Sequence, residues 1–268
     1  MKTPVAIVLG ACLALPAAAQ DALPPGVAGA EVLPGWRTPE GDYIAALKIE
    51  LDAGWKTYWR VPGDAGIPPV LNFAESDNVT DVAVIWPAPE VFDQNGLRTV
   101  GYRNELVLPI RIRPRDPAAP VELDAMMDIG VCHDICVPVS LDLEAAIDGP
   151  GAPDAEIRRA MEAAPVPRPG HAQCSGELIS DGMRVTARID LPPEADEVAM
   201  FELRSTPMWV SEPVMRREGR FLVATVDFVP DDGRPFALDP QDLRITVLGA
   251  GGAVQIDGCP SEPLQAAN

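Results

Sequence analysis

The stretch VELDAMMDIGVCHDICVPVSLDLEAAI, residues 121–147, holds two runs of alternating apolar and polar residues with two cysteines between them. Alternation with a period of two is typical of half-buried strands, so residues 121–130 and 139–147 are predicted to be β-strands. On one continuous strand, residues four apart lie about 13 Å from each other, beyond the reach of a disulfide. If Cys132 and Cys136 are bonded, the chain turns between them, as a hairpin tip or a single helical turn.

Short alternating runs of the same kind occupy most of the chain. They lie at residues 43–54, 79–87 and 104–114 in the first half, and at 183–191, 197–203, 220–228, 243–249 and 253–258 in the second. No helical periodicity separates these runs within either half, and this pattern predicts antiparallel sandwiches. The expected fold class is therefore all-β, with two β-sandwich domains.

Residues 151–170 differ from the rest of the chain. Asp154 is a good N-cap for a short helix that carries Ile157, and the three prolines that follow end this helix. We therefore expect a first β-sandwich at residues 20–150, a helix and proline-rich linker at 151–170, and a second β-sandwich at 171–268.

The chain begins with one lysine, a short apolar run and three alanines, the pattern of a secretory signal peptide. We expect residues 1–19 to be this signal and cleavage to follow Ala19. An alternative is a lipoprotein box around Cys12, which would anchor the chain by lipid. No later segment reaches the roughly 18 apolar residues of a membrane helix, so the exported protein is expected to be soluble.

The composition is acidic, with a formal net charge of −19 and, after the signal, only two lysines, Lys48 and Lys56. Such a field repels nucleic acid and anionic lipid, so neither is an expected partner. The chain has two histidines and no G-x-S-x-G motif, which argues against a hydrolase.

Four cysteines remain after the signal, and they allow three disulfide connectivities. The expected domain division favours Cys132 with Cys136 and Cys174 with Cys259. The second bridge would close a loop of about 86 residues, worth about 4–5 kcal/mol in the chain-entropy model, and reads as structural. The first would close about five residues, worth about 2 kcal/mol, and is a poor staple.

A small ring at a forced turn is expected to be strained and exposed, and such disulfides exchange readily. His133 would stabilise a thiolate on its neighbour Cys132 when protonated. Exchange of this kind needs no cofactor.

A binding module is the alternative function. The thioethers, thiols and imidazole acceptable to Cu(I) are supplied by Met126, Met127, Cys132, His133 and Cys136. Alternation, however, places Met127 on the expected core face, and zinc would need four ligands where at most three are present. No metal ligand is therefore assigned. The same alternative includes an adaptor that docks a redox partner without exchanging electrons.

Three blocks of the sequence resemble a known family. They are GWKTYWRVPGDAGIPP at 54–69, WPAPEVFDQNGLRTVGYRNELVLPI at 86–110, and the cysteine pair followed by Pro138. In this order, over about residues 30–150, they resemble the periplasmic N-terminal domain of the disulfide-interchange proteins DsbD and ScsB. The likeness is closest to the ScsB branch, and it implies immunoglobulin-like sandwiches and a periplasmic location.

The resemblance also implies roles for individual residues. Cys132 and Cys136 would pass electrons, with Cys136 forming the mixed disulfide and Cys132 resolving it. Phe92 matches the aromatic residue of a cap loop, while Tyr58 and Trp59 match aromatic positions near the site. The implied partners are periplasmic thioredoxin-like proteins and a membrane electron donor, which we expect to be a separate protein.

Overall fold

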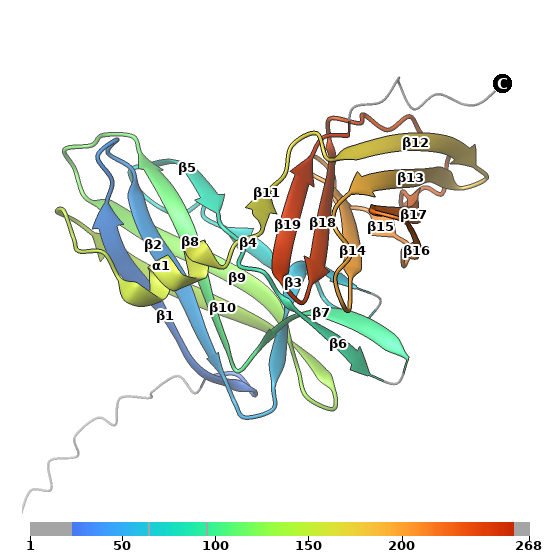
Figure 1. Cartoon of the computed structure of the whole chain (residues 1–268). Helices are drawn as coiled ribbons and strands as arrows, with labels where there is room; N and C mark the ends of the chain where they lie inside the picture. Colours follow the sequence, from blue (N-terminus) through green and yellow to red (C-terminus); the bar gives the residue numbers. More distant parts are fainter. Residues whose placement is uncertain (1–22, 64, 95, 260–268) are drawn as a thin grey trace, which may run out of the picture.

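The computed structural model describes residues 23–63, 65–94 and 96–259, and the predicted signal peptide with Cys12 lies outside them. These residues form four β-sheets and a short helix, α1 (Ala155–Glu162), arranged as two units (Figure 1). The predicted all-β fold class is confirmed. No helix among the described residues is long and apolar enough to cross a bilayer.

Two antiparallel sheets face each other in the first unit. The first sheet has the order β1-β2-β8-β5, with β1 (Val27–Arg37), β2 (Tyr43–Leu51), β8 (Glu105–Pro114) and β5 (Val79–Val84). The second has the order β10-β9-β3-β7-β6, with β10 (Cys136–Ile147), β9 (Val121–Cys132), β3 (Lys56–Gly63), β7 (Leu97–Arg103) and β6 (Glu90–Gln94). A short strand, β4 (Val70–Asn72), also pairs with β9.

The core between these sheets is built by the alternation read from the sequence. On β9, every second side chain from Val121 to Val131 is buried against the opposite sheet. On β3, Trp59 enters the same core and is fully buried. Because successive residues of a strand face opposite sides, Lys56 and Tyr58 lie on the outer face of the sheet.

Helix α1 closes the first unit from outside. The carboxylate of Asp154 accepts hydrogen bonds from the backbone N–H groups of Glu156 and Ile157, as expected of an N-cap. Ile157 is fully buried against Ile44 and Ala46 on the outer face of β2. The helix therefore belongs to the first unit by packing and is more than a linker.

The second unit also has two sheets around its own core. One has the order β11-β19-β18-β14, with β11 (Val166–Pro167), β19 (Gly252–Asp257), β18 (Leu243–Gly249) and β14 (Val198–Leu203). The other contains β12 (Ala172–Ile179), β13 (Gly182–Asp190), β17 (Phe221–Val229), β15 (Trp209–Val210) and β16 (Val214–Glu218). Cys174 on β12 is bonded to Cys259, two residues after β19, with the Cα atoms 5.8 Å apart. This bridge ties one sheet of the unit to the other.

The two units share a packed joint, with β14 beside β3 (Figure 1). Val198, Met200 and Leu248 of the second unit join the apolar cluster of the first. Arg60, next to Trp59 on β3, donates from Nε to Glu202 Oε1 at 2.8 Å. Burial lowers the pKa of Arg60, although Glu202 opposes this shift.

The chain between the units is short. Only residues 163–165 separate the end of α1 from β11, and β11 pairs in parallel with β19. Ala88 of the first unit donates its backbone N–H to the carbonyl of Ala163. The connection is therefore held by the first unit on one side and by the second on the other.

Candidate functional site

The cysteine pair lies at the tip of the β9–β10 hairpin. Cys132 is the last residue of β9 and Cys136 the first of β10, and they stand opposite each other with Cα atoms 4.2 Å apart. They are joined by a disulfide. The three residues between them form the tip, where His133 donates its backbone N–H to the carbonyl of Ile135. Of the two turns that the sequence allowed, the chain adopts the hairpin.

The two cysteines differ in their access to solvent. Cys132 is only 2% exposed, whereas Cys136 is exposed and its neighbour Ile135 is 71% exposed. β10 is the edge strand of its sheet. An edge strand tolerates Pro138, because the N–H that a proline lacks is not needed for pairing on the open side of the sheet. An approaching molecule therefore reaches Cys136 from the open edge, while Cys132 is covered.

Tyr58 covers the disulfide from the outer face of the sheet. Its hydroxyl donates to Cys132 Sγ at 2.9 Å and also lies 3.1 Å from Cys136 Sγ. The side chain is 2% exposed, and burial raises the pKa of the phenol, which keeps it protonated and able to donate. Thr57, between Lys56 and Tyr58, fixes β3 to β9 by donating its hydroxyl to the carbonyl of Gly130.

Phe92 lies on β6, and its ring contacts two positively charged side chains. Its ring centroid is 4.9 Å from Lys56 Nζ and 4.9 Å from Arg103 Cζ, and the side chain is buried. Lys56 Nζ also donates to Thr99 Oγ1 at 3.0 Å and lies 5.9 Å from the ring centroid of Tyr58. Lys56 therefore links the aromatic ring on β6 to the tyrosine that contacts the disulfide.

Lys56 itself is 9% exposed. Burial, and secondly the positive charge of Arg103, lower the pKa of its ammonium. Sequence analysis assigned no role to this lysine, although the rarity of lysine in the chain is a signal that points to it.

His133 projects from the tip. Its Nδ1 lies 3.1 Å from the carboxylate of Asp134, and its ring centroid is 5.9 Å from that of Trp55. Trp55 is partly buried, packs against the core of the first unit and also neighbours the hairpin tip.

Trp59, which the resemblance matches to an aromatic position near the site, faces the core on the opposite side of the sheet from Tyr58. It is fully buried in the sandwich core and stacks under the guanidinium of Arg60, 4.0 Å from the ring centroid. The reason is the alternation of β3, which sends Tyr58 and Trp59 to opposite faces. Trp59 thus supports the core and the joint between the units.

Gly66 and Ile67, which precede β4, also pack against this face of the sheet. A Cβ atom added to Gly130 on β9 would lie 2.8 Å from the side chain of Ile67. A Cβ atom added to Gly66 would lie 2.9 Å from the ring of Tyr58. These close approaches hold the segment against the strand that ends in Cys132.

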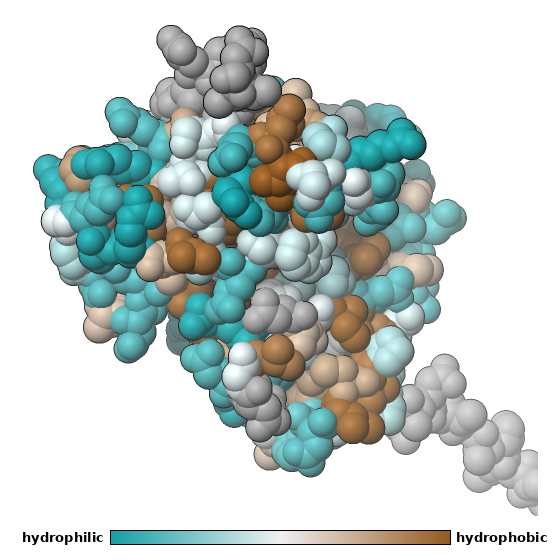
Figure 2. Space-filling model, turned by 90° about the vertical axis from the view of Figure 1, so that its right-hand side faces the viewer, coloured by the Kyte–Doolittle hydropathy of each residue, from teal (hydrophilic) through white to brown (hydrophobic). Residues whose placement is uncertain are grey.

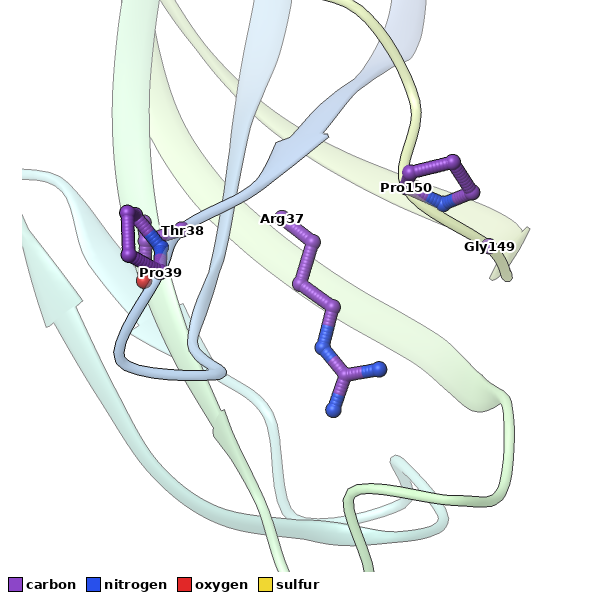
Figure 3. Close-up of a pocket in the computed structure, with 5 residues that line it drawn as sticks. All are labelled: Arg37, Thr38, Pro39, Gly149 and Pro150. Carbon is purple, nitrogen blue, oxygen red and sulfur yellow. The ribbon is translucent and has the colours of Figure 1, made fainter.

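Two cavities among the described residues lie away from the disulfide. One, of about 450 Å³, is lined by Arg37, Thr38, Pro39, Gly149 and Pro150 (Figure 3). It follows the far end of β10, roughly 40 Å along the strand from Cys136 at about 3.3 Å per residue. The other, of about 290 Å³, lies in the second unit beside His171 and Arg220.

The geometry gives little support to the alternative of a copper-binding module. Met127 is fully buried in the core, so its sulfur is not on the face of the cysteine pair. Across the described ranges, no group of three or more His, Cys, Asp or Glu residues is arranged to hold a metal ion.

Comparison with known proteins finds a family match on the first unit. The family model described as thiol:disulfide interchange protein DsbD, N-terminal, matches residues 23–147. The crystal structure of the N-terminal periplasmic domain of ScsB from Proteus mirabilis is 26% identical, with a TM-score of 0.62 over 84% of this chain and 91% of that chain. The reduced DsbD N-terminal domain of Neisseria meningitidis is 17% identical, with a TM-score of 0.27 over 50% of this chain and 96% of that chain.

The comparison with curated proteins found no match. The ScsB likeness extends over both units, whereas the family match ends with β10. Residues 23–147, which carry the whole β9–β10 hairpin and its disulfide, match the family model of the DsbD N-terminal thiol:disulfide interchange domain.

Proposed function

We propose that this chain is a periplasmic thiol–disulfide exchange protein whose Cys132 and Cys136 cycle between disulfide and dithiol. The observation that carries the proposal is the asymmetry of the pair: one sulfur is exposed at a sheet edge, and the other is buried under the Tyr58 hydroxyl. Structural disulfides have no need of such asymmetry. An exchanging pair does, because one sulfur must be reached by a partner and the other must leave.

The chemistry follows from this arrangement. A partner thiolate attacks Cys136 Sγ, a partner–Cys136 disulfide forms, and the Cys132–Cys136 bond breaks with its electron pair on Cys132 Sγ. A second thiolate of the partner then attacks the partner's sulfur in the mixed disulfide. A disulfide forms within the partner, and Cys136 leaves as a thiolate. The protein gains two electrons and the partner leaves oxidised. In the opposite direction, Cys136 thiolate attacks a partner disulfide, and Cys132 thiolate resolves the product.

The partners we propose are a membrane electron donor and periplasmic thioredoxin-like proteins. The family match and the likeness to the N-terminal periplasmic domain of ScsB support this class of partner and this location. Apolar side chains near the hairpin, such as Ile135 and Val70, are exposed and suit protein contacts. Figure 2 shows exposed hydrophobic side chains in brown on one face, interspersed with hydrophilic ones.

Phe92 is proposed as the cap of the pair. Its support is the chain of contacts from the Phe92 ring through Lys56 to Tyr58, and from Tyr58 to both sulfurs. A cap of this kind would limit adventitious attack on the reduced pair until a partner displaces it.

A redox titration in glutathione buffers tests the exchange directly. We expect Cys132 and Cys136 to equilibrate at a potential above about −300 mV, the upper limit typical of structural disulfides in secreted proteins. Peptide mapping reads each pair separately, so that Cys174 and Cys259 serve as an internal reference. A pair that opens only well below that potential would contradict the proposal.

Trapping in the periplasm tests the roles of the two sulfurs. Cys132→Ala keeps the exposed Cys136 but removes the resolving thiol, so mixed disulfides with partners should accumulate and can be identified by mass spectrometry. Cys136→Ala is the matched control, and it should trap little because the remaining sulfur is buried. Equal trapping by both variants would overturn the assignment.

A further inference from the structure

Lys56 is placed to act on the sulfur that leaves during exchange. On β3 it stands opposite Cys132 of β9 on one side and opposite Arg103 of β7 on the other. Side chains of directly opposed residues in an antiparallel pair share a face, with Cβ atoms about 4.5–5.5 Å apart. The lysine stem therefore starts beside the buried cysteine, on the face that also carries Tyr58.

We propose that the ammonium of Lys56 stabilises the thiolate of Cys132, and so promotes both the opening and the resolution of the disulfide. This inference rests on the proposed exchange function, and it deepens it by naming the residue that supplies positive charge to the buried sulfur. Lys56 is a positioning residue in this role, since it acts through its charge and through the aromatic rings that it contacts.

The need for such a charge follows from the electron count. Attack on Cys136 Sγ leaves an electron pair, and one negative charge, on Cys132 Sγ. Cys132 is 2% exposed, so water solvates this charge poorly. The hydroxyl of Tyr58 donates one hydrogen bond to this sulfur, but the hydroxyl carries no formal charge. A cation on the same face supplies the remaining stabilisation, and a better-stabilised thiolate is a better leaving group.

The surroundings make the charge of Lys56 effective. The ammonium is largely buried, where ionic interactions are screened less than at the surface. It is held by Thr99 Oγ1 and lies over the rings of Phe92 and Tyr58. The chain as a whole carries a net charge of −19, yet Lys56 and Arg103 place two cations against the ring of Phe92 on this face.

The other charged groups around this face are more exposed. They are Arg103 on β7, Glu90 on β6, Asp128 on β9, and His133 with Asp134 at the tip. Arg103 lies 4.0 Å from Glu90, and the Asp128 carboxylate accepts a hydrogen bond from Ser140. His133 is beside Asp134. These contacts offset or solvate their charges, and Lys56 is more buried than any of these five groups.

The test is a thiol titration that does not depend on a partner. In a Cys136→Ser background, Cys132 is a lone thiol while the Cys174–Cys259 bridge stays closed, and its thiolate is followed by absorbance at 240 nm as pH rises. Lys56→Met should lower the thiolate population at a given pH at least tenfold, a shift of about one pH unit. Lys56→Arg should keep most of the thiolate, because it keeps the charge.

Two controls separate charge from packing. Lys48→Met removes the other lysine of the described residues, which lies among Glu50, Glu105 and Glu156 on the other sheet, and should leave the titration unchanged. Phe92→Leu removes the ring but keeps the ammonium, and it should shift the titration less than Lys56→Met. Lys56→Gln is a second neutral variant, should the methionine variant fold poorly.

The outcomes are distinguishable from failure of the exchange function. If the wild-type pair does not equilibrate with glutathione, the proposed function fails, but the titration still reports on Lys56. If the wild-type pair exchanges and Cys132 titrates alike with and without the ammonium, only the inference on Lys56 is overturned. In the intact pair, a tenfold change in the equilibrium corresponds to about 30 mV, with Lys56→Met at the more negative potential.

Discussion

Opening the two disulfides one at a time should lower the stability of the protein by very different amounts. The bridges join residues 4 and 85 positions apart, so they close loops of about 5 and 86 residues. In the chain-entropy model, a loop of n residues stabilises by about 298 K × (2.1 + 1.5R ln n), which gives about 2 kcal/mol for the first and about 4.6 kcal/mol for the second. The expected difference is about 2.5 kcal/mol.

Reduction, and not substitution, is the appropriate perturbation, because it leaves the sulfurs in place. The Tyr58 hydroxyl then keeps an acceptor at Cys132, and the buried Cys259 leaves no cavity. Mild reductant should open the hairpin pair first, and strong reductant should then open Cys174–Cys259.

Hydrogen–deuterium exchange measures the effect unit by unit. The first step should reduce protection of β9 and β10 by about 2 kcal/mol or less, and the second should reduce protection of β12, β18 and β19 by about 4–5 kcal/mol. If the first step costs as much as the second, or melts the first unit, the hairpin disulfide is a staple and the reasoning from loop length is refuted.

Three further outcomes are expected. Phe92→Ala should speed alkylation of the reduced hairpin pair without changing the circular dichroism spectrum, with the exposed Leu97→Ala as control; unchanged rates would exclude a cap. Asp154→Ala should destabilise α1 by about 1 kcal/mol, seen as faster hydrogen exchange in the helix, since the carboxylate caps two N–H groups. Burial raises the pKa of Asp257, but the hydrogen bond and charge of Arg244 outweigh it and hold the pKa below its ordinary value of 3.8. The stability that the Asp257–Arg244 pair contributes is present above pH 3.8 and is lost as the pH falls through the lower pKa of the folded state. The urea midpoint of Arg244→Gln should therefore fall less steeply on acidification than that of the wild type. Parallel curves for the two proteins would contradict this.

The elements that the sequence predicted well are those whose signal is local. The alternation from Val121 to Val131 is a direct record of which side chains meet the opposite sheet. Asp154 precedes its helix at the spacing that an N-cap requires. The disposition of the cysteines also follows from local geometry, because four residues of strand are too long for a disulfide to span.

The features that escaped the sequence depend on contacts between distant segments. Tyr58 and Cys132 are 74 positions apart, and Arg60 and Glu202 are 142 apart. In the run from Trp55 to Trp59, bulky side chains are so dense that period-two alternation is hidden, and neighbouring aromatics look equivalent. Only the pairing of β3 with β9 separates Tyr58 on the outer face from Trp59 in the core.

The short connection between the units has a kinetic consequence. With only residues 163–165 between α1 and β11, and with Arg60 bound across the joint, the second unit has no tether on which to swing over the cysteines. A flexible linker can raise the effective concentration of a tethered reactant to the millimolar range. The short connection between these two units does not provide such a linker. Under the proposed exchange function, a turnover with a separate partner protein would begin with a bimolecular collision at the hairpin tip, and its rate should rise in proportion to the free concentration of that partner.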